Sequence, residues 1–235
     1  MLTLAFDTSS RTAAVAVLHD DTILYDSIIN TGLNHSEVLL PEIDNALRQI
    51  HIKISDIDLF ACTLGPGSFT GLRIGVSTLK GLMLATGKPA CGVSTLAAVV
   101  LNIGYSSELI CSMIDAGRGQ VYVAYFKYDD KYILQQISGE QAADPHEIIN
   151  NTDKNTLFVG DGAIKYADII KNIKSPEGCL ASNLQYYIRA SVVGILGRKK
   201  FAENDLLDAS TLVPFYLRSA DAVPHKSIFE KSKTT

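Results

Sequence analysis

Hydrophobic positions in the first part of the chain are grouped into short runs, as they are in β-strands. Short apolar runs of this kind, separated by polar turns, predict strands at residues 2–6, 13–18, 23–29, 58–64 and 90–93. Residues 34–50 and 69–85 instead repeat their apolar positions with the period of a helix, and a shorter helix begins at Ser94 or Thr95. We therefore expect a β-meander followed by β-loop-α units.

The second part of the chain echoes this plan. The segment FDTSSRTAAVAVL at 6–18 aligns without gaps with IDAGRGQVYVAYF at 114–126, and each copy contains a strand, an aspartate, a small polar turn and a second strand. This match alone fits either duplication or coincidence. The later pattern predicts strands at 109–114, 121–128, 132–137 and 156–159, and helices opening at Asp144, at about 163–173 and at 183–199.

Length and composition favour two small lobes with buried cores, since the chain has 235 residues and is 47% hydrophobic and 20% charged. The net charge of −4 excludes tight binding of nucleic acid through many phosphates without a basic partner. No apolar run reaches the length of a membrane span, and MLTLAFDTSS lacks the features of a signal peptide. The four scattered cysteines indicate buried thiols in a reducing compartment, so we expect a cytoplasmic protein.

Two turns contain residues that could bind phosphate. Asp7, Thr8 and Ser9 lie between the first two strands, where hydroxyl and N–H groups could face an anion and the carboxylate could hold Mg²⁺ through water. The alternative is an ordinary β-turn capped by the aspartate side chain. Gly65 and Gly67 belong to GPGSFTGLRIG, which connects a strand to a helix start and could also receive a phosphate, although no Gly-Lys-Ser/Thr completes a Walker A motif.

The helix after this second turn has glycines at positions that favour a close contact. Gly71 and Gly75 are four residues apart, and because glycine is a poor helix former, we interpret them as a flat surface for a neighbouring element. That element could be the protein's own sheet or a partner subunit. His35 has no second ligand one helical turn away, and no nucleophile motif of a hydrolase is visible. We therefore expect neither a metal site nor hydrolase chemistry.

Six segments resemble, in order and spacing, the bacterial TsaB (YeaZ) family: LAFDTSS, NHSEVLLPEI, LGPGSFTGLRIGVSTLKGL, KPACGVSTL, IDAGRGQVYVAYF and PFYLR. The resemblance runs from residue 2 to about 218. It implies an α/β, two-lobed actin-like ATPase fold (ASKHA, ribonuclease H-like) with a duplicated β-meander plus helices and a reduced C-terminal lobe. We accordingly expect an N-terminal, partner-binding lobe at 1–108, a C-terminal lobe at 109–218 and a flexible tail at 219–235.

The resemblance also implies a role. The TsaB family is a paralogue of TsaD, which transfers threonylcarbamoyl to the adenosine 3′ of the anticodon in tRNAs that read ANN codons. TsaD has an H-x-x-x-H metal pair where this chain has Thr95 and Val99, and neither residue is a strong ligand for Fe or Zn. The resemblance thus implies a non-catalytic subunit that needs no cofactor of its own, binds and activates TsaD, and helps recruit the ATPase TsaE. ATP, Mg²⁺ and tRNA would be bound only by the complex.

The family pattern places the TsaD interface on the helices at 34–50 and 69–85. The candidate contact residues are His35, Val38, Leu39, Gly71, Leu72, Gly75, Val76 and Leu79. The same surface could pair two copies of the isolated chain as a homodimer. One alternative is a free-standing ATPase or small-molecule kinase that uses Asp7, Thr8 and the glycine turn. In a non-catalytic subunit, these residues would be only the remains of a phosphate-binding site. A peptidase is the third reading, although no metal pair or nucleophile supports it.

Overall fold

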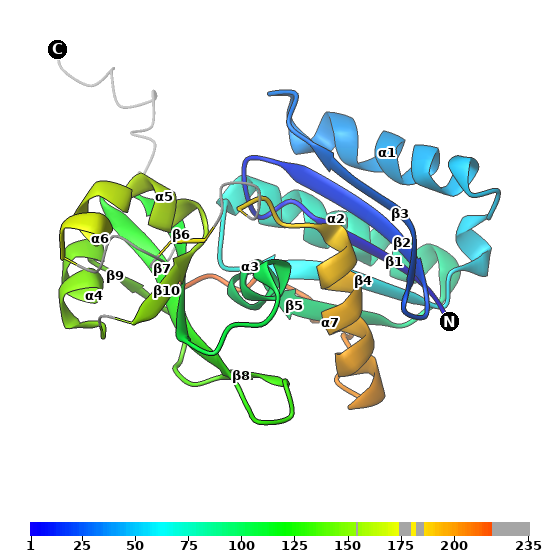
Figure 1. The fold of residues 1–235 in the computed structure, drawn as a ribbon. Coiled ribbons are helices and arrows are strands. Elements are labelled where there is room, and N and C mark those ends of the chain that lie inside the picture. Colours follow the sequence, from blue (N-terminus) through cyan, green and yellow to red (C-terminus); the bar gives the residue numbers. More distant parts are fainter. Residues whose placement is uncertain (154, 174–179, 182–185, 218–235) are drawn as a thin grey trace, which may run out of the picture.

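The computed structural model describes residues 1–153, 155–173, 180–181 and 186–217, which form two β-sheets side by side (Figure 1). The first sheet has the strand order β3-β2-β1-β4-β5. Its strands are β1 (Leu2–Asp7), β2 (Ala13–His19), β3 (Thr22–Ile29), β4 (Leu59–Gly65) and β5 (Ala90–Ser94). The first three strands are antiparallel and the last two are parallel to β1, as expected for a meander followed by β-loop-α units.

The second sheet also has five strands, but they repeat the plan of the first only in part. Its order is β10-β6-β7-β8, and β9 also pairs with β7. The strands are β6 (Leu109–Gly117), β7 (Gln120–Tyr128), β8 (Leu134–Gln136), β9 (Gln141–Ala143) and β10 (Thr156–Val159). The parallel strand β10 occupies the place of β4. On its outer side, where a counterpart of β5 would pair, the described residues form only a single bridge between Phe158 and Leu180. The second lobe is therefore reduced, as the resemblance implied.

Helices cover both faces of the first sheet because its strands alternate between two cores. Leu4 and Phe6 pack under α1 (His35–Gln49) and α2 (Phe69–Thr86), whereas Ala5 between them faces the opposite core. That opposite face is covered by α7 (Ala190–Ala202) and by α3 (Thr95–Ile103), and α3 also contacts β6 and β7 of the second sheet. The outer face of the second sheet is covered by α4 (Pro145–Asn151), α5 (Asp161–Lys165) and α6 (Ala167–Ile173), and a 3-10 turn, Ile54–Asp56, precedes β4.

The chain returns to the first lobe after the second sheet. Helix α7 lies close on the first sheet, and a Cβ atom added at Gly197 would lie 2.5 Å from the Cβ of Ala61. The segment after α7 stays on the same lobe, since the Leu207 N–H donates to the Ala90 carbonyl at 2.9 Å. The expectation that residues 109–218 form the second lobe is thus wrong from α7 onward. The expected tail at 219–235 lies outside the described residues.

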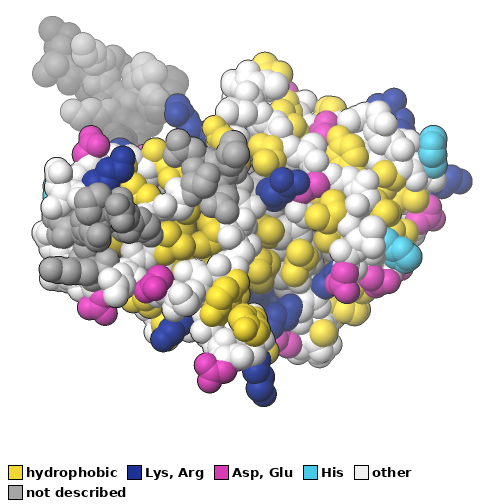
Figure 2. All heavy atoms as spheres, in the orientation of Figure 1, with side chains coloured by type: hydrophobic (Ala, Val, Ile, Leu, Met, Phe, Trp, Pro, Cys, Tyr) yellow, Lys and Arg dark blue, Asp and Glu magenta, His cyan; other side chains and the backbone are white. Residues whose placement is uncertain are grey.

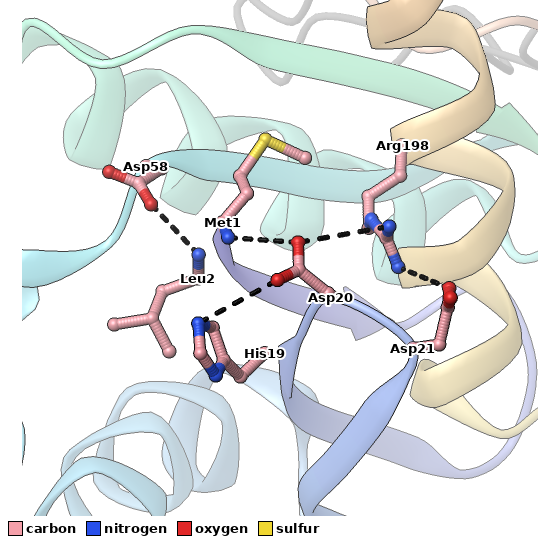
Figure 3. Close-up of polar contacts among 7 residues, drawn as sticks. All are labelled: Met1, Leu2, His19, Asp20, Asp21, Asp58 and Arg198. Carbon is pink, nitrogen blue, oxygen red and sulfur yellow. Dashed lines mark hydrogen bonds and ion pairs between the residues drawn. The ribbon is translucent and has the colours of Figure 1, made fainter.

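Charged contacts fix α7 to the β2–β3 hairpin at two levels. At its start, Arg189 Nε lies 2.9 Å from Asp26 Oδ2, a carboxylate that also accepts from the Ser191 hydroxyl at 2.6 Å. Two turns later, Arg198 Nη1 lies 2.9 Å from Asp21 Oδ1, and Nη2 lies 4.0 Å from Asp20 (Figure 3). The amino terminus also contacts the Asp20 carboxylate, so strand β1 joins the same network.

The remaining differences from the predicted elements lie in the second half of the chain. The helix predicted at 163–173 is two helices divided at Tyr166, and the helix predicted at 183–199 begins at Ala190 where it is described. The strand predicted at 132–137 is shorter. Among the described residues, no helix combines the length and hydropathy needed to cross a membrane.

The cysteines agree with the sequence-based prediction where they are described. Cys62, Cys91 and Cys111 are buried free thiols, and Cys179 lies outside the described residues. Burial raises the pKa of Cys91 to about 11 and also raises that of Cys62. Raised pKa values keep these thiols protonated and unreactive at neutral pH.

Candidate functional site

The turn after β1 holds the Asp7 carboxyl inside the protein. Its Oδ1 accepts hydrogen bonds from the Ser9 N–H at 3.1 Å, the Ser9 hydroxyl at 2.5 Å and the Thr63 hydroxyl at 2.5 Å. Its Oδ2 has no hydrogen-bond partner among the described residues. Burial raises the pKa of Asp7, and the hydrogen bonds from Ser9 and Thr63 oppose that rise. The carboxyl group therefore supports the turn from within.

The two turns with candidate phosphate-binding residues pack directly against each other. A Cβ atom added at Gly67 would lie 2.3 Å from the Ser9 carbonyl oxygen, and that oxygen accepts the Ser68 N–H at 2.7 Å. Gly65 is equally crowded, since an added Cβ would lie 2.4 Å from the Phe215 carbonyl oxygen. The groups that would have to surround a phosphate with its Mg²⁺ are thus engaged with one another. The residues present do not fit such a ligand between these turns.

The glycines of α2 contact the chain's own first turn. A Cβ atom would lie 1.9 Å from the Thr8 carbonyl oxygen if added at Gly71, and 2.5 Å from the Thr8 hydroxyl if added at Gly75. The sequence left open whether these glycines face the protein's own core or a partner, and the structure assigns them to the core. Their inclusion among the partner-contact residues is therefore wrong.

The same correction applies to most of the apolar contact candidates. Leu39, Val76 and Leu79 are buried in the core between α1, α2 and the first sheet, and Leu72 is also buried. Amphipathic periodicity marks the face of a helix that is buried, and here that face meets the chain's own sheet. Val38 and His35 are only partly buried, and His35 Nε2 lies 2.9 Å from the Ser10 carbonyl oxygen.

The outward faces of α1 and α2 carry apolar and small residues that the sequence-based candidate set did not contain. Leu40 of α1 is 55% exposed and Leu84 of α2 is 77% exposed. Between the ends of α2, Gly81 is exposed, and an added Cβ would meet no atom within 4 Å. Gly81 and Leu84 lie opposite the buried stripe of α2, and Leu40 lies at the edge of the buried stripe of α1, as a helical projection of the sequence shows.

A cavity of about 600 Å³ lies where α1 and α2 begin, beside the turn after β1. Its lining residues are Arg11, Asn30, Gly32, Leu33, Asn34, His35, Ser36, Ser68, Thr70, Gly71 and Ile74. Leu33 at this site is 57% exposed. The lining of this cavity combines apolar side chains, such as Leu33 and Ile74, with polar groups.

The C-terminal segment supports the start of α2. Arg73 Cζ lies 3.9 Å from the ring centroid of Phe69, and the rings of Phe69 and Tyr216 are 4.8 Å apart between centroids. Arg73 Nε also donates to the Tyr216 hydroxyl at 3.2 Å. Tyr216 of the PFYLR segment thus lies against the same helix that carries Leu84 and Gly81.

Thr95 and Val99 lie one turn apart on α3 and line a second cavity, of about 330 Å³, between the lobes. Neither side chain offers a strong metal ligand. Within the residues that the structure describes, no group of three or more His, Cys, Asp or Glu side chains could hold a metal ion.

Comparisons with known proteins agree on the family. Residues 30–222 match the family model described as TsaD, tRNA N6-adenosine threonylcarbamoyltransferase. The chain is 32% identical over 225 residues to the tRNA threonylcarbamoyladenosine biosynthesis protein TsaB of Bacillus subtilis, which covers 94% of this chain and 96% of that protein. The chain belongs to the TsaB family, within the wider TsaD family.

Solved structures of TsaB relatives share the fold. YeaZ from Pseudomonas aeruginosa has a TM-score of 0.76 at 25% identity, over 92% of this chain and 99% of that chain. Component A of the (R)-2-hydroxyglutaryl-CoA dehydratase of Acidaminococcus fermentans is similar in fold alone, with a TM-score of 0.51 at 14% identity, over 86% of this chain and 99% of that chain. The resemblance seen in the sequence and the two-lobed actin-like α/β fold are both confirmed.

Proposed function

We propose that this chain is a non-catalytic subunit in tRNA threonylcarbamoyladenosine biosynthesis in the cytoplasm. It binds and activates a TsaD protein, helps to recruit TsaE, and leaves the transfer of threonylcarbamoyl to the tRNA adenosine to TsaD. Similarity to the tRNA threonylcarbamoyladenosine biosynthesis protein of Bacillus subtilis supports this pathway. Contact with tRNA is indirect, in agreement with the net charge of −4.

The proposal that a partner binds this chain rests on the outward faces of α1 and α2. Exposed Leu40 and Leu84 lie on helices whose inner faces are fully used by the chain's own core, so these apolar side chains are available to another protein. Gly81 lets a partner helix approach closely, because helices whose contact residues are small can pack at the short end of the usual interaxial range of about 8–10 Å. We infer that a helix of TsaD packs across this face.

The residues at the position of the TsaD metal pair and in the two candidate phosphate-binding turns support a non-catalytic role. Thr95 and Val99 replace the metal pair that the resemblance assigns to TsaD. The Asp7 turn and the glycine turn hold each other through Ser9, Gly67 and Ser68. ATP and Mg²⁺ are therefore expected to bind only in the complex with TsaD and TsaE.

The test is co-purification of the chain with TsaD from the same organism, together with mass measurement of threonylcarbamoyladenosine in tRNA. Leu84→Glu and Leu40→Glu should each weaken the complex at least about tenfold, because each buries a carboxylate in an apolar contact. Ile137→Glu is the matched control, since Ile137 is also 55% exposed but lies in the second lobe after β8. A complex unaffected by both leucine variants would overturn this interface.

A homodimer through the same face is the second candidate assembly. Size-exclusion chromatography with light scattering measures the mass of the chain alone, with and without Leu84→Glu. A homodimer that Leu84→Glu dissociates would show that this face also pairs two copies of the chain.

The ATPase alternative predicts Mg²⁺-dependent binding of ATP to the isolated chain, abolished by Asp7→Ala. We expect no such binding in calorimetry, because Asp7 is buried and its Oδ1 is already bonded to Ser9 and Thr63.

A further inference from the structure

The cavity between the two lobes has the size and walls of a small-molecule site. Its volume of about 330 Å³ lies at the lower end of the range of roughly 300–1,000 Å³ that such sites occupy. Val99 of α3, Ile114 of β6 and Ile188 before α7 form a buried apolar wall, and Ile164 of α5 and Tyr187 stand at the exposed side. Figure 2 shows hydrophobic side chains across the middle of this face of the molecule.

A buried polar group in this lining has no partner. Thr95 is fully buried, and its hydroxyl makes no hydrogen bond with the described residues. Buried hydroxyl groups are normally bonded to protein or water, because leaving one unpaired costs stability. A polar atom of a bound molecule would give the Thr95 hydroxyl its partner.

The charges around the cavity favour one sign of ligand. Arg11 is exposed at the rim and forms no ion pair or hydrogen bond with the described residues. Asp161 is the acidic residue of the lining, and its Oδ1 already accepts the Asp115 N–H at 2.9 Å. Arg11 is therefore a cation without a counter-ion among the described residues, and a neutral N–H group occupies one oxygen of the opposing Asp161 carboxylate.

We propose that the cavity binds a small organic acid with an apolar ring or branched body. The body would lie among Val99, Ile114 and Ile188, the carboxylate would pair with Arg11, and a polar atom would reach Thr95. Such a ligand would contact the first lobe through α3 and the turn after β1, and the second lobe through β6 and α5. This site does not include Leu40, Gly81 or Leu84 of the proposed TsaD interface, although Arg11 also lines the cavity at the start of α1 and α2.

The test uses three probes of one shape and different charge: phenylacetate, phenylacetamide and 2-phenylethylamine. Each is titrated into the isotope-labelled full chain while amide shifts are followed by NMR. Phenylacetate should cause saturable shifts around Thr95, Val99 and Ile164, and it should bind about fivefold more tightly than the amide, the factor expected for one partly exposed ion pair. Tighter binding of the amine would assign the charge recognition to Asp161 and overturn the proposal, as would the absence of saturable shifts with every probe.

Variants separate the parts of the site. Arg11→Gln should remove the preference for the acid over the amide, and Ile164→Trp should abolish binding of both by filling the cavity from its exposed side. Arg48→Gln, on an exposed arginine of α1, should change neither. Thermal unfolding of each variant checks that the fold is retained, and an unchanged acid preference in Arg11→Gln would contradict the proposal. None of these measurements involves TsaD, so a failure here leaves the proposed function unaffected.

Discussion

The Thr8 hydroxyl lies 2.8 Å from the Gly71 carbonyl oxygen and donates a hydrogen bond to it across 63 positions of sequence. This bond joins the turn after β1 to the first turn of α2, a helix for which the sequence pattern also allowed contact with a partner. Both groups are buried, and the approach is so close that residue 71 has no room for a side chain. The glycines of α2 are thus explained by the fold of the chain itself.

Two glycines of α2 should therefore respond in opposite ways to the same substitution. Gly75→Leu should lower the unfolding free energy by about 3 kcal/mol or prevent folding, because its Cβ would lie 2.5 Å from the Thr8 hydroxyl. Gly81→Leu should raise the unfolding free energy by up to about 1 kcal/mol, since leucine is a better helix former and the added atoms meet nothing. Urea unfolding followed by circular dichroism measures both.

The same pair tests the interface. Gly81→Leu should weaken binding of TsaD although the variant is more stable than the wild type. Equal binding by Gly81→Leu and wild type would place the partner elsewhere on the chain.

Asp7 should make the stability depend on pH in a defined direction. Burial raises its pKa in the folded state, so the folded protein takes up this proton more readily than the unfolded chain. The protonated carboxyl stabilises the folded state fully below the ordinary aspartate pKa of about 3.9. This stabilisation is lost as the pH rises through the higher pKa of the folded state. Relative to Asp7→Asn, the wild type should therefore lose unfolding free energy between about pH 4 and pH 7.

Urea unfolding of both proteins across this pH range measures the difference. Asp7→Ala tests the hydrogen bonds, because it leaves the hydroxyls of Ser9 and Thr63 without their acceptor and should cost about 2–4 kcal/mol near pH 4. Since alanine does not titrate, this loss should become smaller as the pH rises. A wild type that gains stability over Asp7→Asn as the pH rises would show that the carboxylate is the favoured form.

The close seating of α7 predicts a compensating pair. Gly197→Ala should destabilise the protein by about 1–3 kcal/mol, because the new methyl group would lie 2.5 Å from the Cβ of Ala61. Ala61→Gly in the same molecule removes the opposing methyl group and should restore part of the loss. A double-mutant cycle of unfolding free energies checks this, and strictly additive losses would mean that the two positions do not touch.

The two arginines that fix α7 should differ in their importance. Asp26 is 5% exposed, so removing its partner by Arg189→Met leaves a buried carboxylate and should cost about 2 kcal/mol or more. Asp21 is 99% exposed, so Arg198→Met, which keeps the apolar stem, should cost less than about 1 kcal/mol. Thermal unfolding of the two variants side by side gives the ranking, which an equal or reversed loss would contradict.

The sequence was a good guide to the first lobe because its strands and helices are short-range patterns. The runs at 2–6, 13–18 and 58–64 appear as β1, β2 and β4 with ends within about one residue. The return of α7 could not be read in the same way. Helix α7 packs on the first sheet because Gly194 and Gly197 lie against small residues on distant strands, such as Ala5 and Ala61. The periodicity of one segment cannot predict which distant residues it will contact.

The candidate site was harder to predict for a related reason. The spacing of Gly71 and Gly75 correctly indicates one shared helix face, but it contains no information on what lies opposite that face. Thr8 fills that place from a turn more than sixty positions away. Asp7 and Thr8 were recognised as polar turn residues, whereas their complete burial depends on the contact with α2.

The return of α7 also sets the order in which the lobes can be completed during synthesis. The β2–β3 hairpin leaves the ribosome early, yet Asp20, Asp21 and Asp26 must wait for Arg189 and Arg198, which are made more than 160 residues later. The second sheet is synthesised in that interval and can form first. The first lobe to be translated is thus the last to be completed, and every copy that stops before α7 lacks the helix that covers Ala5, Ala61 and Leu18 on its first sheet.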